Sequence, residues 1–308
     1  MNAKVADAIS KSAAVPSIPQ VVTRFLEVIQ DPNFDYDDVV KAIGADAGTV
    51  SEILRLANSA LFGVSRKVTS LRQALTLLGP RRTRSLVLGR YLVEAVGGTG
   101  GEFVDRNYFW RRSLAAAVIG ARLADDLCPR LRDEVFLSAL LADVGVSILA
   151  EAMPHEYGPI AQAYAPHGGV ISPEAEQKAV GATHAEVSAM VLAEWSLPDP
   201  LCEAVRLSHD ANVEAVSEGT HMARIINAAD RVGRMLCEIP DVAKSAEECA
   251  AAMEFVGAEL HVIARILGEV EKAVEELAAI LKIDVIPSQV YTKIAEAVRD
   301  RLAAGAAH

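Results

Sequence analysis

The chain has 308 residues and is 51% hydrophobic, which allows one large or two modest domains with well-formed cores and excludes a disordered protein. Aromatic residues make up only 5%, so Ala, Val, Leu and Ile carry the apolar side, a composition that predicts an all-α fold. The formal net charge of −11 argues against nucleic acid and against an anionic membrane surface as the main partner.

Helix breakers and capping residues divide the first 97 residues into short amphipathic helices. Prolines at 16 and 19 separate the first two, and Asp35 and Asp46 are suited to cap the next pair. Ser70-Leu-Arg-Gln73 reads as a capping box, and Gly79-Pro80 separates its helix from the one that follows. The predicted helices cover residues 2–12, 19–30, 35–43, 46–57 and 70–79, with another beginning at Pro80.

Three arginines, Arg81, Arg82 and Arg84, fall in the first turn of the helix that begins at Pro80. Cations there oppose the positive end of the helix dipole. One interpretation is a solvated helix end. The other is a docking point for an acidic partner or a phosphate, because guanidinium groups and free backbone donors would converge there.

The glycine-rich run at 97–101 is the clearest linker and predicts a subdomain boundary. Beyond it we expect a helix over 107–125 and a buried helix over 131–153, which carries the single carboxylate Asp143 in its middle. A buried carboxylate needs a hydrogen-bonded or charged partner. Further helices are predicted from Ser172, from the capping box Thr183-His-Ala-Glu186, from Asp199, and from Thr220 to about Glu238.

The last part of the chain predicts a capping box at Ser245-Ala-Glu-Glu248, one long helix over 258–282, and a final helix from Pro287 to about Leu302. Apolar residues in the long helix alternate in steps of three and four, the spacing of a coiled-coil seam. That seam either packs on its own protein or serves self-association, and both alternatives stay open here.

Two features favour the cytoplasm. The four cysteines, Cys128, Cys202, Cys237 and Cys249, form no C-x-x-C pair and fit reduced thiols. The N-terminus lacks a signal-peptide pattern, and the longest apolar stretch carries Asp143 and ends at Pro154, as expected of a core helix and not of a membrane span.

Few polar residues lie within the apolar helices of the second half: Asp143, His184, His209 and Asp230. They come from four separate predicted helices. Helical bundles build metal and cofactor sites by pointing such residues inward, and two histidines with two carboxylates are a plausible ligand set for a transition metal.

The order of several motifs resembles the HDOD family of bacterial output domains, relatives of the HD metal-dependent phosphohydrolases. The resemblance covers about residues 15–235. Its segments are Ser17-Ile-Pro-Gln-Val-Val, Ile53-Leu-Arg-Leu-Ala-Asn-Ser-Ala-Leu-Phe-Gly63, Ser70 to Gly79, Phe109-Trp110 with Ser113, Ala139-Leu-Leu-Ala-Asp-Val-Gly145, Thr183-His-Ala-Glu-Val-Ser188, Trp195-Ser-Leu-Pro198 and Ala229-Asp230.

The resemblance implies a metal centre that has lost ligands. Catalytic HD enzymes use an early His, a His-Asp pair, further His residues and a final Asp. Here the pair is Ala142-Asp143, the early His falls near Arg112 or Ser113, and Ser208 stands before His209. We therefore expect no bound metal, no cofactor and no enzyme activity. The vestigial cluster of Arg112, Asp143, His184, His209 and Asp230 is expected to be a buried polar network, with Arg112 pairing Asp143.

These observations predict a helical N-terminal subdomain over 1–97, an HD-like helical subdomain over 98–240 and a C-terminal helical extension over 241–308. The resemblance implies a non-catalytic signalling module that binds proteins or a small ligand, with the groove between the subdomains as the natural place. One alternative is a metal-dependent phosphohydrolase with an incomplete ligand set. Another is a scaffold that dimerises through 258–282.

Overall fold

The fold is known from a computed structural model, which describes residues 3–12, 14–15, 17, 20–30, 34–44, 47–59, 66–96, 101–166, 168–238, 242–281 and 288–305. Over these residues the chain forms sixteen α-helices, one short 3₁₀ helix and no strand. The predicted all-α fold is confirmed. Four predicted features lie wholly or mostly outside the described residues: the prolines at 16 and 19, the cap at Asp46, the glycine linker at 97–101 and the start of the last helix at Pro287.

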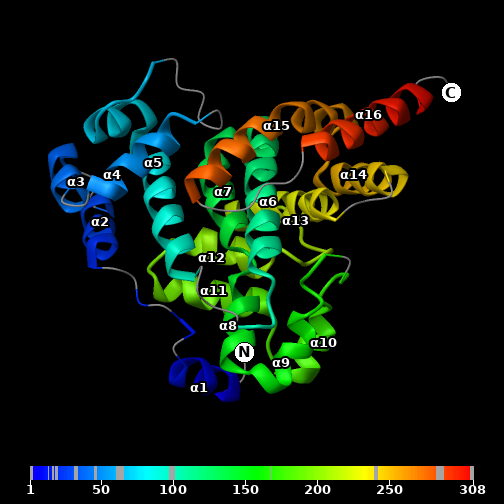
Figure 1. The fold of residues 1–308 in the computed structure, drawn as a ribbon, viewed down its shortest axis with the longest axis horizontal. Helices are drawn as coiled ribbons and strands as arrows, with labels where there is room; N and C mark the ends of the chain where they lie inside the picture. The colour runs from blue at the N-terminus through cyan, green and yellow to red at the C-terminus, as the bar shows by residue number, and fades with distance from the viewer. Residues whose placement is uncertain are drawn as a thin grey trace.

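The N-terminal helices lie in two separate places on the molecule. Its helices are α1 (Ala3–Lys11), α2 (Gln20–Gln30), α3 (Tyr36–Ile43), α4 (Ala47–Ala57) and α5 (Leu71–Val96). Helices α2, α3 and α4 pack against α5, whereas α1 lies apart from them, beside α8 (Val144–Ala152) (Figure 1). Val5 and Ile9 bury the apolar side of α1, and Lys4 lies 3.1 Å from Glu156.

Helix α5 is kinked where the sequence predicts two helices. Gly79 has φ 78° and ψ 171°, a conformation that a glycine adopts without strain, and Pro80 starts the second segment. The second segment packs against α7 (Arg132–Leu141), because Gly89 leaves room for the side chains of Leu137 and Leu140. Helix α5 therefore packs both on the helices of the predicted N-terminal subdomain and on α7 of the predicted HD-like subdomain, and the boundary between the two stays a prediction.

Helix α6 (Arg106–Leu127) is the central element of the rest of the chain. After it come η1 (Pro129–Leu131), α7, α8, α9 (Pro154–Ala161), α10 (Pro173–Ala179), α11 (His184–Glu194), α12 (Asp199–Arg206) and α13 (Glu218–Cys237). It contacts α7 and α13 closely because its residues there are small: a Cβ on Gly120 would lie 3.1 Å from Val135 and 3.4 Å from Ala229. This packing brings the helices that carry the polar residues together.

One predicted helix is two. The expected single helix over 131–153 is broken at Ala142 and Asp143, where a turn separates α7 from α8. Asp143 has φ −103° and ψ 8°, outside the helical region, and is the residue that precedes α8. The apolar pattern alone could not reveal this break, because both helices and the turn between them are buried.

The C-terminal extension consists of α14 (Val242–Val256), α15 (Leu260–Leu281) and α16 (Ser288–Gly305). Helix α15 packs against α6 within the same chain, and α14 packs against α13 (Figure 1). The seam residues Ile263, Leu267, Val270, Val274 and Leu277 are at most 2% exposed. These seam residues therefore pack within their own chain, and self-association through this helix stays a prediction.

Several predicted caps are confirmed and two are wrong: Asp35 accepts from the backbone of Asp37 at the start of α3, and Ser70 accepts from the backbone of Gln73 at the start of α5. Thr183 and Glu186 form the expected capping box at α11. Thr220 is not a cap, because α13 begins earlier, with Ser217 as its capping residue. Ser245 lies inside α14, where it is fully buried, and does not begin a helix.

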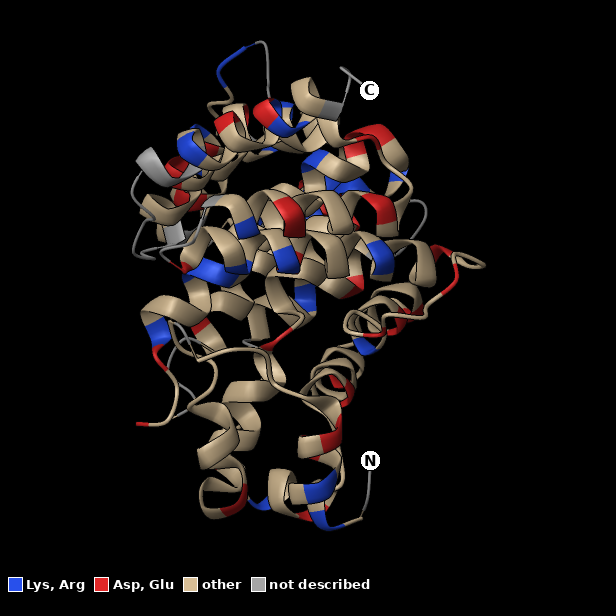
Figure 2. Cartoon of the chain, turned by 90° about the vertical axis from the view of Figure 1, so that its right-hand side faces the viewer, with Lys and Arg blue, Asp and Glu red and all other residues tan. Residues whose placement is uncertain are grey.

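The surface and the apolar segments fit a compact helical bundle. Among the described residues one helical stretch, Pro129–Ala152, is long and apolar enough to cross a membrane, but 89% of its most apolar window is buried. That burial and the turn at 142–143 are those of core helices. On the side seen in Figure 2, acidic and basic positions are interspersed along the helices, so the net negative charge does not gather in one place there.

Candidate functional site

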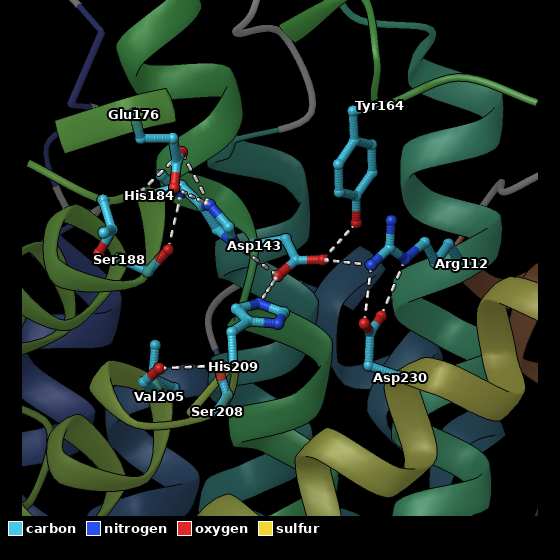
Figure 3. A network of polar contacts seen from close by, with 12 residues as sticks. Arg112, Asp143, Tyr164, Glu176, His184, Ser188, Val205, Ser208, His209 and Asp230 are labelled. Carbon is cyan, nitrogen blue, oxygen red and sulfur yellow. Dashed lines mark hydrogen bonds and ion pairs between the residues drawn. The ribbon is translucent and has the colours of Figure 1, made fainter. Parts of the chain in front are cut away.

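Asp143 is placed by a close contact between α8 and α11. The backbone N–H of Gly145 donates to Ser188 Oγ at 2.8 Å, and a Cβ on Gly145 would lie 2.1 Å from the carbonyl oxygen of His184. Only a glycine permits this approach. It fixes the turn before α8, so that the Asp143 side chain points between the helices and is 5% exposed (Figure 3).

His184 is the first residue of α11 and is held by a buried glutamate. Its backbone N–H and its ring Nδ1 both approach Glu176 Oε1, at 3.1 and 2.9 Å, and Nδ1 lies 3.0 Å from Oε2. Glu176 comes from α10, is fully buried, and accepts a further hydrogen bond from the hydroxyl of Tyr157 at 2.5 Å. The imidazole is therefore fixed on one edge, and its Nε2 faces Asp143 (Figure 3).

His209 reaches the same carboxylate from the turn after α12. Its Nε2 lies 2.9 Å from Asp143 Oδ1, and its ring centroid is 4.7 Å from that of His184. The turn itself is held from α13, because Asn227 donates to the carbonyl of Ser208 at 2.9 Å. Three predicted site residues, Asp143, His184 and His209, thus meet at one point.

Arg112 and Asp230 form the other half of the cluster. Nε and Nη2 of Arg112 lie 2.8 and 2.7 Å from the two oxygens of Asp230, a bidentate pair that joins α6 to α13. Arg112 was expected to pair with Asp143, but its Nη2 is 3.9 Å from Asp143 Oδ2. The main partner of Arg112 is therefore Asp230, and Asp143 is a secondary neighbour.

Two residues of the cluster, Tyr164 and Glu176, were not predicted from the sequence. Tyr164 donates its hydroxyl to Asp143 Oδ2, and its ring lies 4.4 Å beneath the guanidinium of Arg112. Glu176 is the second. The one available signal for it is an acidic residue in the short helix just before the Thr183 capping box, and that signal does not reveal burial.

The charges of the cluster interact strongly. Burial would raise the pKa of Asp143, but His209, His184 and Arg112 outweigh it and hold this pKa well below its usual range. Burial disfavours a charged imidazole, yet Glu176 and then Asp143 raise the pKa of His184 to about 10. Burial raises the pKa of Tyr164 well above its usual value, so its hydroxyl stays a donor. Without a bound ion, the cluster therefore contains an ionised Asp143 and a protonated His184 at neutral pH.

The donor set fits a single metal ion, although the sequence led us to expect none. Asp143, His184 and His209 each offer one ligand atom, and these atoms lie within 4.8 Å of one another. Nε2 of His184 is buried and makes no hydrogen bond within the described residues, since Asp143 Oδ1 is 3.6 Å away. Two imidazoles and one carboxylate suit divalent ions such as zinc, iron or manganese. A bound ion would act there as a Lewis acid.

The three arginines at the start of the second segment of α5 face α7. Arg82 Nε lies 3.1 Å from Asp133, and Arg84 lies 3.6 Å from Glu134. Arg81 is more exposed and reaches the carbonyl of Arg130 at 3.4 Å. All three guanidinium groups are thus engaged within the protein, Arg81 by the longest contacts, and an acidic partner for them stays a prediction.

A groove of about 1010 Å³ lies between the N-terminal helices and the rest of the molecule. Its walls come from α1, the segment that follows it, α2, and the end of α11. Asp7, Glu27 and Glu194 lie among the described residues that line it, and the other described lining residues have hydroxyl or apolar side chains; Asp7 is paired with Lys11 at 2.6 Å. No residue of the polar cluster lines this groove.

Comparison with known proteins identifies the sequence pattern. The model of the HDOD domain family matches residues 15–211, more than half of the chain. An uncharacterized protein of Treponema pallidum is 24% identical over 201 residues, which are 64% of this chain and only 38% of that protein's length.

Solved structures share the fold at low sequence identity. A candidate phosphohydrolase from Shewanella amazonensis has a TM-score of 0.68 and 19% identity, covering 95% of this chain and 98% of its own. An HDOD domain protein of unknown function from Geobacter sulfurreducens has 0.64 and 21%, covering 90% and 96%. A candidate signal transduction protein from Marinobacter aquaeolei has 0.61 and 17%, covering 91% of this chain and 65% of its own. The similarity over 95% of this chain includes most of the C-terminal extension, which lies outside the sequence match.

Proposed function

Because this chain belongs to the HDOD domain family, we propose that it is a non-catalytic signalling output module of the bacterial cytoplasm that acts by binding another protein. The observation that carries the proposal is the groove between the N-terminal helices and α11, which is separate from the polar cluster. Concave sites between subdomains are preferred places for ligands. The fold shared with a candidate signal transduction protein agrees with this role.

The lining of the groove indicates the chemistry of the partner. Asp7, Glu27 and Glu194 are exposed at the groove, while Trp195 and Ile9 are buried beside them. Carboxylates over an apolar floor suit a partner segment with basic side chains on one side and apolar ones on the other. We therefore expect a basic, amphipathic segment of a signalling protein, with a small cationic ligand as the simpler possibility.

The contacts of the polar cluster support a non-catalytic role. Hydrolysis by a metal-bound hydroxide needs an open coordination position that the substrate can reach. The side chains of Asp143 and His184 are 5% exposed, and Asp230 is occupied by Arg112. His209, the most accessible of the ligand candidates, is 20% exposed. These contacts favour a structural network over a substrate site.

Charge reversal in the groove tests the proposal. Cross-linked partners are captured from the native cytoplasm with the wild type, with Glu27→Lys and Glu194→Lys combined, and with the control Glu214→Lys, which changes an exposed carboxylate outside the groove. We expect a partner that is retained by the control and lost from the double variant. A partner set unaffected by the double variant would rule out the groove.

Two further arms test the alternatives. Arg81→Glu with Arg82→Glu and Arg84→Glu, in the same capture, tests whether the arginines bind an acidic partner. Hydrolysis of cyclic dinucleotides and of nucleoside phosphates, measured with added manganese, iron or zinc, tests the phosphohydrolase alternative. Turnover that is lost with Asp143→Asn would overturn the non-catalytic proposal.

A further inference from the structure

We propose that the groove between the N-terminal helices and α11 is one half of a larger docking surface, which continues past Met190 onto α12 and binds a single basic amphipathic helix. A second hollow of about 660 Å³ lies beside the groove, and its walls come from α11 and α12. Met190 lines both hollows, so they adjoin at this side chain. This surface extends the site of the proposed function, on which the proposal rests.

Helix α11 joins the two hollows because it presents a different side to each. Met190 and Glu194 line the groove, whereas Glu186 and Ala189, one turn earlier, line the second hollow together with Met190. Helix α12 packs along α11 and forms the far wall (Figure 1). Met190 is half-buried at the junction, and the flexible thioether of a methionine suits an apolar contact at the centre of a binding surface.

The charges of this surface are mostly negative. The described lining residues of the two hollows include six carboxylates and one guanidinium: Asp7, Glu27, Glu186, Glu194, Asp199 and Glu203, and Arg206. Three of the carboxylates have partners in the protein. The other three, Glu27, Glu194 and Asp199, are exposed and form no ion pair with described residues. They lie on α2, α11 and α12, so positive groups are favoured along the whole surface.

The size of the surface favours a helix over a small ligand. The groove measures about 1010 Å³ and the second hollow about 660 Å³. Together they exceed the sites of small molecules, which occupy about 300–1,000 Å³. Apolar side chains lie in both hollows, among them Leu26, Trp195 and Pro200, with carboxylates beside them. A helix with an apolar stripe flanked by lysines or arginines matches this arrangement.

The backbone at Ser196 is an independent observation that points to a ligand. Ser196 follows α11, where the N–H of Leu197 donates to the carbonyl of Leu192 at 3.0 Å, and its φ is 56°. Glycine is the usual residue in this left-handed position, because a side chain there is strained. The Ser196 hydroxyl is exposed at the groove and makes no hydrogen bond within the described part of the chain. A hydroxyl kept at a strained position is explained if it hydrogen-bonds the partner.

Binding of a synthetic peptide tests the surface. The peptide is about 20 residues long, with leucine at every third or fourth position and lysine elsewhere, so that it forms an amphipathic helix. Its matched control carries glutamate in place of lysine. Calorimetric titration of the full-length protein should show one lysine peptide per chain, an affinity that falls as salt rises, and no binding of the glutamate peptide. A protein that binds neither peptide, or both equally, overturns the proposal.

Variants locate the bound helix. Asp199→Lys, which reverses a charge on α12 outside the groove, should weaken binding of the lysine peptide about 5- to 10-fold. Ser196→Gly should weaken it about 5-fold, while the thermal midpoint of the protein stays equal or rises because glycine removes the strain. The control Glu214→Lys, outside both hollows, should change neither quantity. Wild-type affinity in Ser196→Gly refutes the contact with its hydroxyl.

The same titrations separate this proposal from the proposed function. If Glu194→Lys weakens binding and Asp199→Lys does not, the surface ends at α11, and the extension to α12 is refuted while the groove stands. If the lysine peptide does not bind at all, the helix is refuted as the occupant, and the capture experiment with Glu27→Lys and Glu194→Lys still decides whether the groove binds a protein.

Discussion

Replacing Arg112 with methionine should strongly destabilise the protein. Arg112 and Asp230 are 5% and 8% exposed, and they share two charge-assisted hydrogen bonds at 2.8 and 2.7 Å. Removal of the guanidinium leaves Asp230 as a buried carboxylate without its partner. Breaking a buried pair in this way costs about 3–5 kcal/mol of unfolding free energy.

A double variant separates the cost of the unpaired Asp230 charge from the loss of the packing that the Arg112 side chain provides. The double variant Arg112→Met with Asp230→Leu removes both charges, and replacing a buried pair with apolar residues is often neutral. We therefore expect the double variant to regain most of the stability that Arg112→Met loses. Arg265→Met is the matched control, because its pair with Asp126 is about 40% exposed on both sides and contributes less than about 1 kcal/mol.

Thermal unfolding followed by circular dichroism, with chelator present, measures the three variants. At about 2 °C per kcal/mol for a chain of this size, Arg112→Met should lower the midpoint by roughly 6–10 °C. The control should stay within about 2 °C of the wild type. An unchanged midpoint in Arg112→Met, or a double variant less stable than the single one, would refute this account of the cluster.

Three further predictions concern other contacts. Gly145→Ala forces a Cβ against the His184 carbonyl and should lower the free energy of unfolding in urea by about 3 kcal/mol. The control Gly89→Ala, whose Cβ would have its nearest contact at 3.6 Å, should be neutral or slightly stabilising. Equal effects of the two substitutions would contradict this account. In chelated protein the raised pKa of His184 adds stability that is complete below pH 6.5 and lost as the pH rises to about 10. The urea midpoint should fall over that interval, and Glu176→Gln should flatten the fall; a flat wild-type profile would disprove the link. Leu267→Asp places a carboxylate at a position that is 1% exposed and should lower the free energy of unfolding by about 3 kcal/mol or more. A variant that stays folded but has half the wild-type mass in light scattering would instead support a dimer through α15.

The helices were predictable because their determinants are local. The Thr183 capping box, the spacing of apolar residues in α15 and the Gly79-Pro80 kink each depend on residues within a few turns. The break at Ala142 and Asp143 was not predictable, since a buried turn carries the same apolar pattern as the helices beside it. A cap such as Ser245 also fails when tertiary packing extends the helix across it.

The members of the polar cluster were largely predictable, but their pairing was not. Asp143, His184 and His209 stood out as polar residues in apolar helices, and the structure brings them together. The pairing of Arg112 with Asp230 depends on how α6 and α13 cross, which no local pattern encodes. Glu176 and Tyr164 were missed because their importance comes from burial against distant segments.

The packing of α15 on α6 has a consequence for the order in which the protein can form. Helix α6 ends at residue 127, yet one of its faces is covered by a helix that ends at residue 281. At about 5–20 residues per second of synthesis, roughly 8–30 s pass between the two. During that interval an apolar face of α6 stays uncovered, because α15 has not yet been synthesised. We expect the nascent chain to engage chaperones in this window, and a chain cut near residue 240 to aggregate.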